Sequence, residues 1–323
     1  RCPAERIDAL RERQMAAGFK PMYDGMCRDK NYPDDGTPFC VRLKTPRTGF
    51  TRISDRIRGE ITVSNEEVDD LVLLRTDGTP TFNFAVVVDD HDMRITHVIR
   101  GDDHLNNTIK QVLIYEALGY PLPQFVHLPQ ILGNDKTRLS KRHGATGVLE
   151  YRDQGYLADA MVNYIARLGW GHGDQEFFTR EELIRLFSIE EINKSAAVFD
   201  PQKLLWLNGE HIRAKSVEEL ADLFAEHMRR KQYLGEQTEA FLRDRGRIQQ
   251  IVACTQVRAK TLDEIYQMVL FLFQEDLTYP EKEAQKFFRP DALQGLRALA
   301  AFAAAHRDQD LPPEAWEQVF QRV

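Results

Sequence analysis

The sequence has few cysteines and no long hydrophobic run, and each shortage argues against a class of protein. Among its 323 residues are four cysteines, without the paired spacing of a disulfide framework, at Cys2, Cys27, Cys40 and Cys254. No apolar stretch approaches the roughly 20 residues of a membrane span. The first residues form a charged amphipathic stretch, unlike a signal peptide. We therefore expect a cytoplasmic protein with no membrane partner.

Positive charge is in the minority. The chain has 43 Lys and Arg residues against 50 Asp and Glu residues, which gives a net charge of −7. This balance disfavours indiscriminate nucleic-acid binding, although a local basic patch can still bind phosphate on an acidic protein. Hydrophobic residues make up 42% of the chain, enough for ordinary cores, and the length predicts two or three domains.

The first half of the chain has the pattern of an α/β protein. A short helix is expected over 4–17, and 20–60, rich in Pro, Gly and Asp, suggests a small irregular β-containing module. Further along, the predicted elements are strands at 71–74 and 84–88, a strand ending at Arg100-Gly101, a helix over 106–118 and a strand within 124–132. Strand, helix and strand with buried apolar runs are typical of a parallel α/β sheet.

From about residue 155 the spacing of apolar residues becomes helical. Three segments match a capping box ahead of an apolar-periodic run: Thr179–Glu182, Ser216–Glu219 and Thr261–Glu264. In "FDPQKLLWLNG", Asp200 should cap a helix that begins at Pro201 and stops at Asn208-Gly209. We therefore expect an α/β part followed by an all-α part, with the boundary near 150–210.

The segment "DKTRLSKRHGA" (135–145) is strongly basic and has no apolar face. Four cationic side chains and a histidine lie within eight positions: Lys136, Arg138, Lys141, Arg142 and His143. Such a run repels itself unless an anion binds there. It follows an expected strand, at the carboxyl end where α/β folds bind ligands, and its cations would stabilise charge developing on a phosphate. Charge alone favours the alternative of a solvated basic turn.

The pattern is more specific than its charge. "RLSKR" (138–142) resembles the KMSKS signature of class I aminoacyl-tRNA synthetases, in the form that the glutamyl enzymes carry. The segments 61–75, 78–108 and 198–213 resemble blocks of the bacterial glutamyl-tRNA synthetases, in that family's order. The resemblance runs without a gap from about residue 1 to 215 and continues weakly beyond.

The resemblance implies a fold and a division into parts. The fold would be α/β plus all-α, with part of a class I Rossmann-like nucleotide-binding domain followed by helical domains. The expected parts are an inserted acceptor-binding module (1–80), the second half of the catalytic domain ending in the KMSKS-like loop (81–145), a stem-contact helical region (146–213) and a helical anticodon-binding domain (214–323). The family's HIGH motif has no counterpart here, so we expect an interior fragment with half of the ATP site.

The resemblance also implies residues that bind the amino acid. Arg100 matches the arginine that holds a carboxylate of glutamate, a task for which a guanidinium is well suited. The alternative is an ion pair of Arg100 with Asp102 or Asp103. Phe82 and Val86 fall where the family lines the amino-acid pocket. Phe82 lacks the hydroxyl of the tyrosine found in many members.

The ATP site is implied in the same way. Lys141 matches the second KMSKS lysine, which contacts the phosphates of ATP. The predicted catalytic residues are Lys141, Ser140 and Arg138, and the predicted ATP-binding residues are Lys141, Asp102, Asp103 and His104. Arg138 replaces the usual first lysine and keeps its charge but not its geometry. We interpret Asp102 and Asp103 as supporting residues and not as a carboxylate dyad.

The implied reaction has two steps: ATP-dependent activation of L-glutamate to glutamyl-adenylate, then transfer to the 3′ end of tRNA-Glu. ATP with Mg²⁺ would be required, and positioning and cationic stabilisation would carry the rate. The family suggests a monomer. One alternative is a catalytically inactive tRNA-binding relative. Another is a relative that glutamylates a modified tRNA base, against which the helical region after 214 argues.

Zinc is a further implication of the resemblance. Some bacterial members carry a zinc site early in the chain, and Cys2 and Cys27 could be two of its ligands. Asp29 stands where a His or Cys would complete the site. Two thiols fall short of a four-ligand structural site, so we favour two free cysteines and predict no metal.

Overall fold

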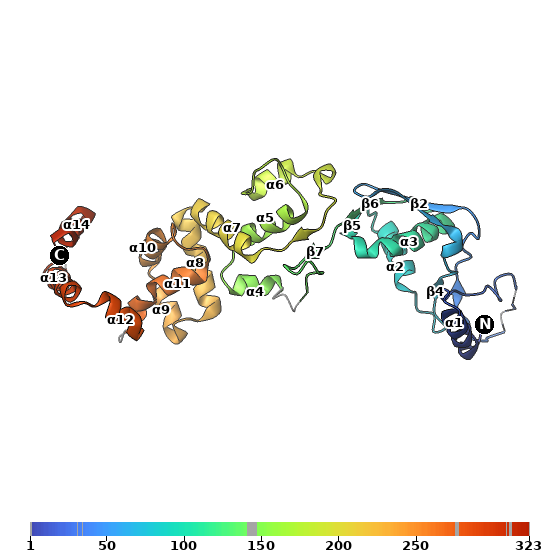
Figure 1. Cartoon of the computed structure of the whole chain (residues 1–323), viewed down its shortest axis with the longest axis horizontal. Helices are drawn as coiled ribbons and strands as arrows, with labels where there is room; N and C mark the ends of the chain where they lie inside the picture. The colour runs from blue at the N-terminus through green and yellow to red at the C-terminus, as the bar shows by residue number, and fades with distance from the viewer. Residues whose placement is uncertain are drawn as a thin grey trace. The chain divides into compact units, whose positions relative to one another are not determined.

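The computed structural model of the chain describes residues 2–30, 32–33, 35–140, 147–274, 278–307, 309 and 312–322. The chain divides into two compact units, Arg1–Ile265 and Tyr266–Val323. All strands of the described residues belong to the first unit, as Figure 1 shows by colour along the chain. No helix in this part of the chain has the length and apolar character to cross a membrane.

A four-stranded sheet organises the first half of the chain. Its strands, in spatial order, are β3 (Gly59–Ser64), β2 (Phe50–Asp55), β6 (Gln124–Leu128) and β5 (His97–Gly101). The strands β5 and β6 are parallel, β2 is parallel to β6, and β2 and β3 form an antiparallel hairpin. The expected parallel sheet is thus confirmed, with an antiparallel strand at one edge. Because the sheet joins strands from both sides of residue 80, the proposed division at 80 stays a prediction.

Residues 84–88 form part of a helix, so the strand predicted there is wrong. The helix α2 (Phe82–Asp92) packs on α3 (Leu105–Leu118), which confirms the helix expected over 106–118. The β-branched run favours a strand by propensity, but Val87 is completely buried against Ile114 and Tyr115 of α3. Packing outweighs β-propensity here. The strand predicted at 71–74 is present as β4 (Val72–Leu74), which pairs with β1 (Val41–Arg42).

The single strand expected within 124–132 is two strands in two sheets. After β6 the chain leaves the first sheet at Pro129, which has no N–H to donate to a ladder. It then forms β7 (Ile131–Leu132), which pairs in parallel with β8 (Ala197–Val198). The basic loop therefore begins at a small second sheet, whose other strand comes from the helical half of the chain.

Helices dominate from Val148 onward, slightly earlier than the predicted start near residue 155. In the first unit they are α4 (Val148–Asp153), α5 (Ala158–Gly169), α6 (Arg180–Leu186), α7 (Pro201–Ala214), α8 (Val217–Lys231), α9 (Thr238–Leu242) and α10 (Arg245–Thr255). The helix α11 (Leu262–Val269) spans the boundary between the units. The second unit continues with α12 (Glu281–Phe287), α13 (Pro290–Ala305) and α14 (Pro313–Arg322), and α1 (Ala4–Ala16) forms the predicted N-terminal helix.

Two of the three predicted capping boxes are complete. At Thr179 and at Ser216 the hydroxyl accepts from the backbone of the glutamate three residues on, and that glutamate accepts from the cap backbone. The third is only half formed. Thr261 Oγ1 accepts from Glu264 N at 3.1 Å, but the carboxylate of Glu264 accepts from the backbone of Lys260.

The helix α7 begins as predicted but does not stop at Asn208-Gly209. Asp200 caps it through the backbone N–H of the second and third residues, and the helix runs on to Ala214. Asn208 is completely buried and bonds to Leu157 N and Lys260 O. A Cβ on Gly209 would lie 3.3 Å from the Lys260 side chain. This Asn-Gly pair therefore joins neighbouring segments by close packing and does not end a helix.

Candidate active site

Arg100, at the end of β5, is a half-buried cation whose guanidinium donates to neutral side chains. Its Nη2 donates to Thr108 Oγ1 at 2.6 Å and to Gln111 Oε1 at 2.7 Å, both on α3. Burial lowers the pKa of Arg100 below its ordinary value, and Asp90 opposes that effect. Among the described residues, no carboxylate lies within ion-pair distance of Arg100. A cation in this setting is suited to receive the carboxylate of a ligand.

The alternative partners of Arg100 are engaged elsewhere. Asp102 accepts from Arg58 at 2.6 Å and from Gln130 Nε2 at 2.9 Å. Asp103 pairs with Arg138 at 3.0 Å. The geometry therefore does not support a simple ion pair of Arg100 with either aspartate.

The short helix η2 (Asp102–His104) meets the base of the basic loop. The Asp103–Arg138 ion pair joins two residues that sequence reasoning had assigned to the same site. A Cβ on Gly101 would lie 2.6 Å from Asp103 Oδ1, so the glycine makes room for that carboxylate. His104 Nδ1 lies 3.2 Å from Asn107 Nδ2. No contact here identifies a nucleotide, and the assignment of these residues to ATP stays a prediction.

The basic loop starts as a tight turn after β7. Gly133 N donates to Thr137 O at 2.8 Å, and Leu139 N donates to Ile131 O at 2.9 Å. Lys136 adopts a left-handed backbone with φ of 58°. Ser140 and Arg138 are both exposed at the end of this turn. The predicted phosphate-binding Lys141, with Arg142 and His143, lies outside the described residues.

The helix α2 supplies the remaining predicted pocket residues. Phe82 begins the helix and is 56% exposed, and Val86 is half-buried. Asn83, between them, accepts from Gln111 Nε2 at 3.1 Å and so links α2 to an acceptor of Arg100. The role of Phe82 and Val86 in an amino-acid pocket stays a prediction.

Sequence reasoning missed the side chains that hold Arg100. Thr108, Gln111 and Tyr115 follow one another at helical spacing on α3 and are all buried. Polar residues on the inward face of a helix need partners, and that pattern was the available signal. The hydroxyl of Tyr115 has no partner among the described residues, and burial raises its pKa to about 12. Asp90 faces the same interior, and burial raises its pKa against the influence of Arg100.

The structure brings Cys2 and Cys27 together, 25 residues apart in the chain. Their Sγ atoms lie 3.2 Å apart, and the Tyr23 hydroxyl lies 3.3 Å from Cys2 Sγ. They line a cavity of about 430 Å³ with Cys40 and other residues. Although burial opposes it, hydrogen bonds from Tyr32, Tyr23 and Cys2 lower the pKa of Cys27 to about 7.

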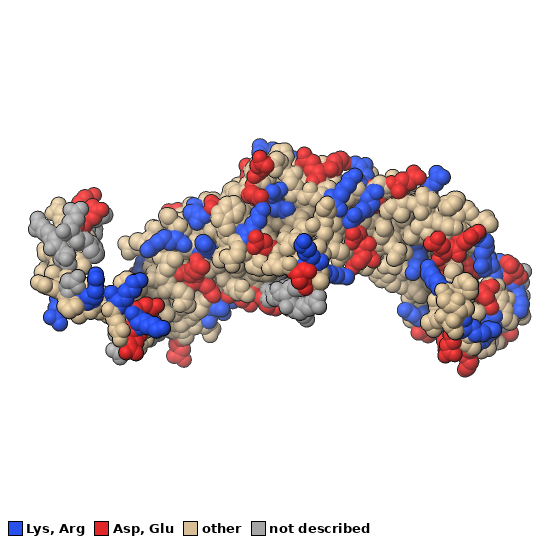
Figure 2. All heavy atoms as spheres, viewed as in Figure 1, with Lys and Arg blue, Asp and Glu red and all other residues tan. Residues whose placement is uncertain are grey.

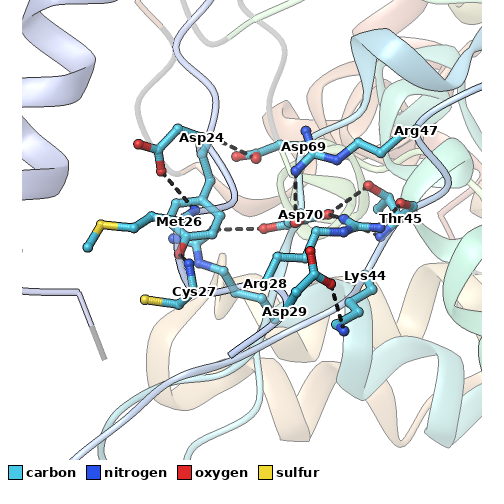
Figure 3. Close-up of polar contacts among 12 residues, drawn as sticks. Asp24, Met26, Cys27, Arg28, Asp29, Lys44, Thr45, Arg47, Asp69 and Asp70 are labelled. Carbon is cyan, nitrogen blue, oxygen red and sulfur yellow. Dashed lines mark hydrogen bonds and ion pairs between the residues drawn. The ribbon is translucent and has the colours of Figure 1, made fainter. Parts of the chain in front are cut away.

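The described part of this cluster does not make a four-ligand zinc site. It offers two thiols and the phenols of Tyr23 and Tyr32, and no group of three His, Cys, Asp or Glu side chains suited to a metal occurs among the described residues. Asp29, at the position considered for a further ligand, is strongly exposed and bonds to Lys44 at 3.3 Å, as Figure 3 shows. That the two thiols are free, and not zinc ligands, stays a prediction.

Asp70 lines the same cavity as the cysteine pair and ties the N-terminal module together (Figure 3). It is 4% exposed, pairs with Arg28 and accepts from Thr45 N at 3.1 Å and Thr45 Oγ1 at 3.0 Å. Arg47 lies 3.5 Å from its second oxygen. Burial alone would raise the pKa of Asp70, but Arg28 and Thr45 lower it. This carboxylate is therefore a charged structural centre.

The fold and these motifs define a class I aminoacyl-tRNA synthetase. Residues 1–206 match the family of class I tRNA synthetases (E and Q), catalytic domain, and residues 212–323 match an anticodon binding domain. Because the first match covers more than half of the chain, the chain belongs to the class I tRNA synthetases of the E and Q type. The α/β part is thus a Rossmann-like catalytic part, followed by a helical anticodon-binding part.

Particular relatives are named glutamate–tRNA ligases. The one from Geobacter sulfurreducens is 50% identical over 306 residues, covering 93% of this chain and 63% of the relative. That from Geotalea uraniireducens is 46% identical, covering 100% of this chain and 67% of the relative. A crystal structure of a glutamate tRNA ligase from Elizabethkingia meningosepticum in complex with its amino acid matches with a TM-score of 0.80 and 28% identity, covering 99% of this chain and 68% of that one. The chain therefore spans about two thirds of the length of these relatives.

Proposed function

We propose that this chain acts as part of a glutamate–tRNA ligase, which activates L-glutamate with ATP and transfers it to tRNA-Glu. The observation that carries the proposal is Arg100, a half-buried cation held by two neutral side chains and lacking an ion pair among the described residues. Burying such a charge is costly unless a ligand of opposite charge binds to it. Relatives of this name at about 50% identity support the choice of glutamate.

In this proposal Arg100 holds a carboxylate of glutamate, and Phe82 and Val86 line the pocket around it. The other carboxylate attacks the α-phosphorus of ATP, which releases pyrophosphate. Lys141, Ser140 and Arg138 stabilise the phosphates from the basic loop. The contact between Arg138 and Asp103 supports the loop's place beside η2, where we also assign Asp102 and His104 to the ATP site.

Mg²⁺ supplies charge compensation for the phosphates when it is bound with ATP. Among the described residues at this site, Asp102 and Asp103 are each occupied by an arginine and do not form a free carboxylate pair. These two carboxylates therefore offer no free ligand pair for Mg²⁺, and the phosphates of ATP would supply most of the negative charge that holds it. Zinc is not required by the proposal.

The tRNA is proposed to lie along the helical part, which follows from its match to an anticodon binding domain. Several basic residues there are already paired: Arg229 with Glu239, Arg230 with Glu226, and Arg245 with Asp222. Figure 2 shows acidic and basic side chains interspersed over the visible face. On this face recognition would thus depend on local contacts and not on a broad basic surface. We further propose a cytoplasmic monomer with the four-part division predicted above.

The test is charging of purified tRNA-Glu with labelled glutamate. The 323-residue chain and the full reading frame that encodes it are compared, each also as Lys141→Ala. Lys110→Ala is the matched control, since Lys110 is an exposed lysine of α3 outside the basic loop. We expect the full reading frame to charge tRNA-Glu. The Lys141→Ala variant should lose most of this charging activity, and the Lys110→Ala variant should keep it. Binding of tRNA without any charging would support an inactive tRNA-binding relative instead.

A further inference from the structure

Asp55, at the end of β2, and His127, in β6, form a buried pair that the proposed reaction does not use. Both side chains are 0% exposed, and His127 Nδ1 lies 2.7 Å from Asp55 Oδ2. The same oxygen accepts from the backbone N–H of His127 at 3.1 Å. The other oxygen accepts from the backbone N–H of Ile57 and of Arg58. The carboxylate only accepts, so Nδ1 of His127 carries a proton.

The second imidazole nitrogen faces Arg100. His127 Nε2 lies 2.8 Å from Thr108 Oγ1 and 3.4 Å from Nε of Arg100. Because a guanidinium only donates, Nε2 of His127 must accept. Thr108 Oγ1 accepts from Arg100 Nη2 at 2.6 Å, so its own proton goes to an acceptor. His127 Nε2 at 2.8 Å is much nearer than the other acceptor, His104 O at 3.4 Å, and therefore receives it. The contacts therefore select the neutral imidazole protonated on Nδ1.

These bonds form a chain with one direction. Arg100 donates to Thr108, Thr108 donates to His127, and His127 donates to Asp55. Every link depends on the next, because reversing His127 would set two donors against each other at Nε2. The chain brings together one side chain each from β5, α3, β6 and β2, so it connects the central sheet to the arginine.

The arrangement leaves one nitrogen of the guanidinium, Nη1, for a ligand. Nε and Nη2 of Arg100 are used by His127, Thr108 and Gln111. Among the described residues, Nη1 has no hydrogen-bond partner. A carboxylate approaching Nη1 would meet donors whose direction the protein has already set, which lowers the cost of ordering them on binding.

We propose that Asp55, His127 and Thr108 are positioning residues that hold Arg100 with Nη1 directed at the carboxylate of the amino-acid substrate. This proposal rests on the proposed function, because it takes Arg100 as the residue that binds glutamate. None of the three touches the substrate; they act through Arg100.

The charge state of Asp55 agrees with this role. Burial would raise its pKa, but hydrogen bonds from the backbone of Arg58 and from the side chain of His127 lower it below its ordinary value. The acceptor end of the chain is therefore ionised at neutral pH. The alternative is a purely structural role, in which Asp55 only joins β2 to β6 and does not orient Arg100. The experiment must distinguish these two roles.

The experiment uses the full reading frame and measures tRNA-Glu charging with glutamate and ATP varied separately. Thr108→Val removes the hydroxyl but keeps the shape, and Thr108→Ser keeps the hydroxyl. Thr51→Val is the matched control, since it also removes the hydrogen bond of a buried threonine, here 2.6 Å from β2 to Asn65, and this bond does not involve Arg100. Positioning predicts a glutamate KM raised about 10- to 100-fold in Thr108→Val, the range for losing a hydrogen bond to a charged group. The ATP KM should stay unchanged, and Thr108→Ser should restore most of the loss.

The outcomes separate the two proposals. If the wild-type protein does not charge glutamate, the proposed function and this inference both fail. If it does, and Thr108→Val keeps its glutamate KM or changes both KM values as Thr51→Val does, only the positioning role is overturned. A ¹⁵N-NMR spectrum of His127 gives an independent check. We expect protonation on Nδ1 alone, and protonation on Nε2 would contradict the chain of donors.

Discussion

Replacing Arg100 tests the site most directly. In Arg100→Ala the substrate carboxylate would enter a half-buried site without its cation, while Thr108 and Gln111 would lose the donor that they share. Removing one partner of a buried, hydrogen-bonded charge pair costs about 2–5 kcal/mol. That corresponds to a loss of roughly 30- to 5,000-fold in kcat/KM for glutamate, at about 1.36 kcal/mol per tenfold.

Folding stability should change much less than binding. Arg100 has no ion pair with a described residue to lose, and its removal also relieves the cost of burying its charge. Arg100→Lys is the informative second variant. It keeps the charge but cannot reproduce the anchored fork, so we expect an intermediate loss.

The assay is steady-state charging of tRNA-Glu by the full reading frame at varied glutamate, beside thermal unfolding of each variant. A raised glutamate KM or abolished activity with an intact fold agrees with the reasoning. Normal glutamate saturation in Arg100→Ala would refute it, because Arg100 would then serve only its neighbours on α3.

Three further predictions concern other parts of the chain. Lys141→Ala in the full reading frame should strongly reduce pyrophosphate exchange in the presence of tRNA-Glu, and unchanged exchange would contradict the assignment of the basic loop. Arg167 most strongly lowers the pKa of Glu176 to about 2, so Glu176 should stabilise the fold above its unfolded pKa near 4.5 and lose this effect as pH falls toward 2. The free energy of unfolding in urea should therefore change less with pH in Glu176→Gln than in the wild-type protein, by about 1–3 kcal/mol across that window. Identical pH profiles of the two proteins would contradict this. In chelator-treated protein, alkylation of Cys27 should reach half its maximal rate near pH 7, and a profile equal to that of the exposed Cys254 would contradict the lowered pKa.

Local signals in the sequence were reliable where neighbours along the chain decide the outcome. The caps at Thr179, Ser216 and Asp200 formed as expected, because the hydroxyl or carboxylate and the N–H groups it accepts from lie within three residues. The KMSKS-like pattern and Arg100 were also read from short segments. The family that they indicated is the one that the chain belongs to.

Tertiary packing decided the places where sequence reasoning failed. The run at 84–88 has strand-like residues, but burial of Val87 against α3 made it helical. Asn208-Gly209 has the composition of a helix stop. The buried contacts of Asn208 with distant backbone instead kept it inside α7.

The sequence by itself determined the class of this protein, its strand-then-helix order and the arginine proposed to bind its substrate. Only the tertiary structure showed what holds that arginine, because Asp55 and His127 are 72 residues apart and meet through pairing of neighbouring strands. Their hydrogen bonds depend on distance and direction in space. A one-dimensional pattern carries neither, whereas the register of β2 on β6 fixes both.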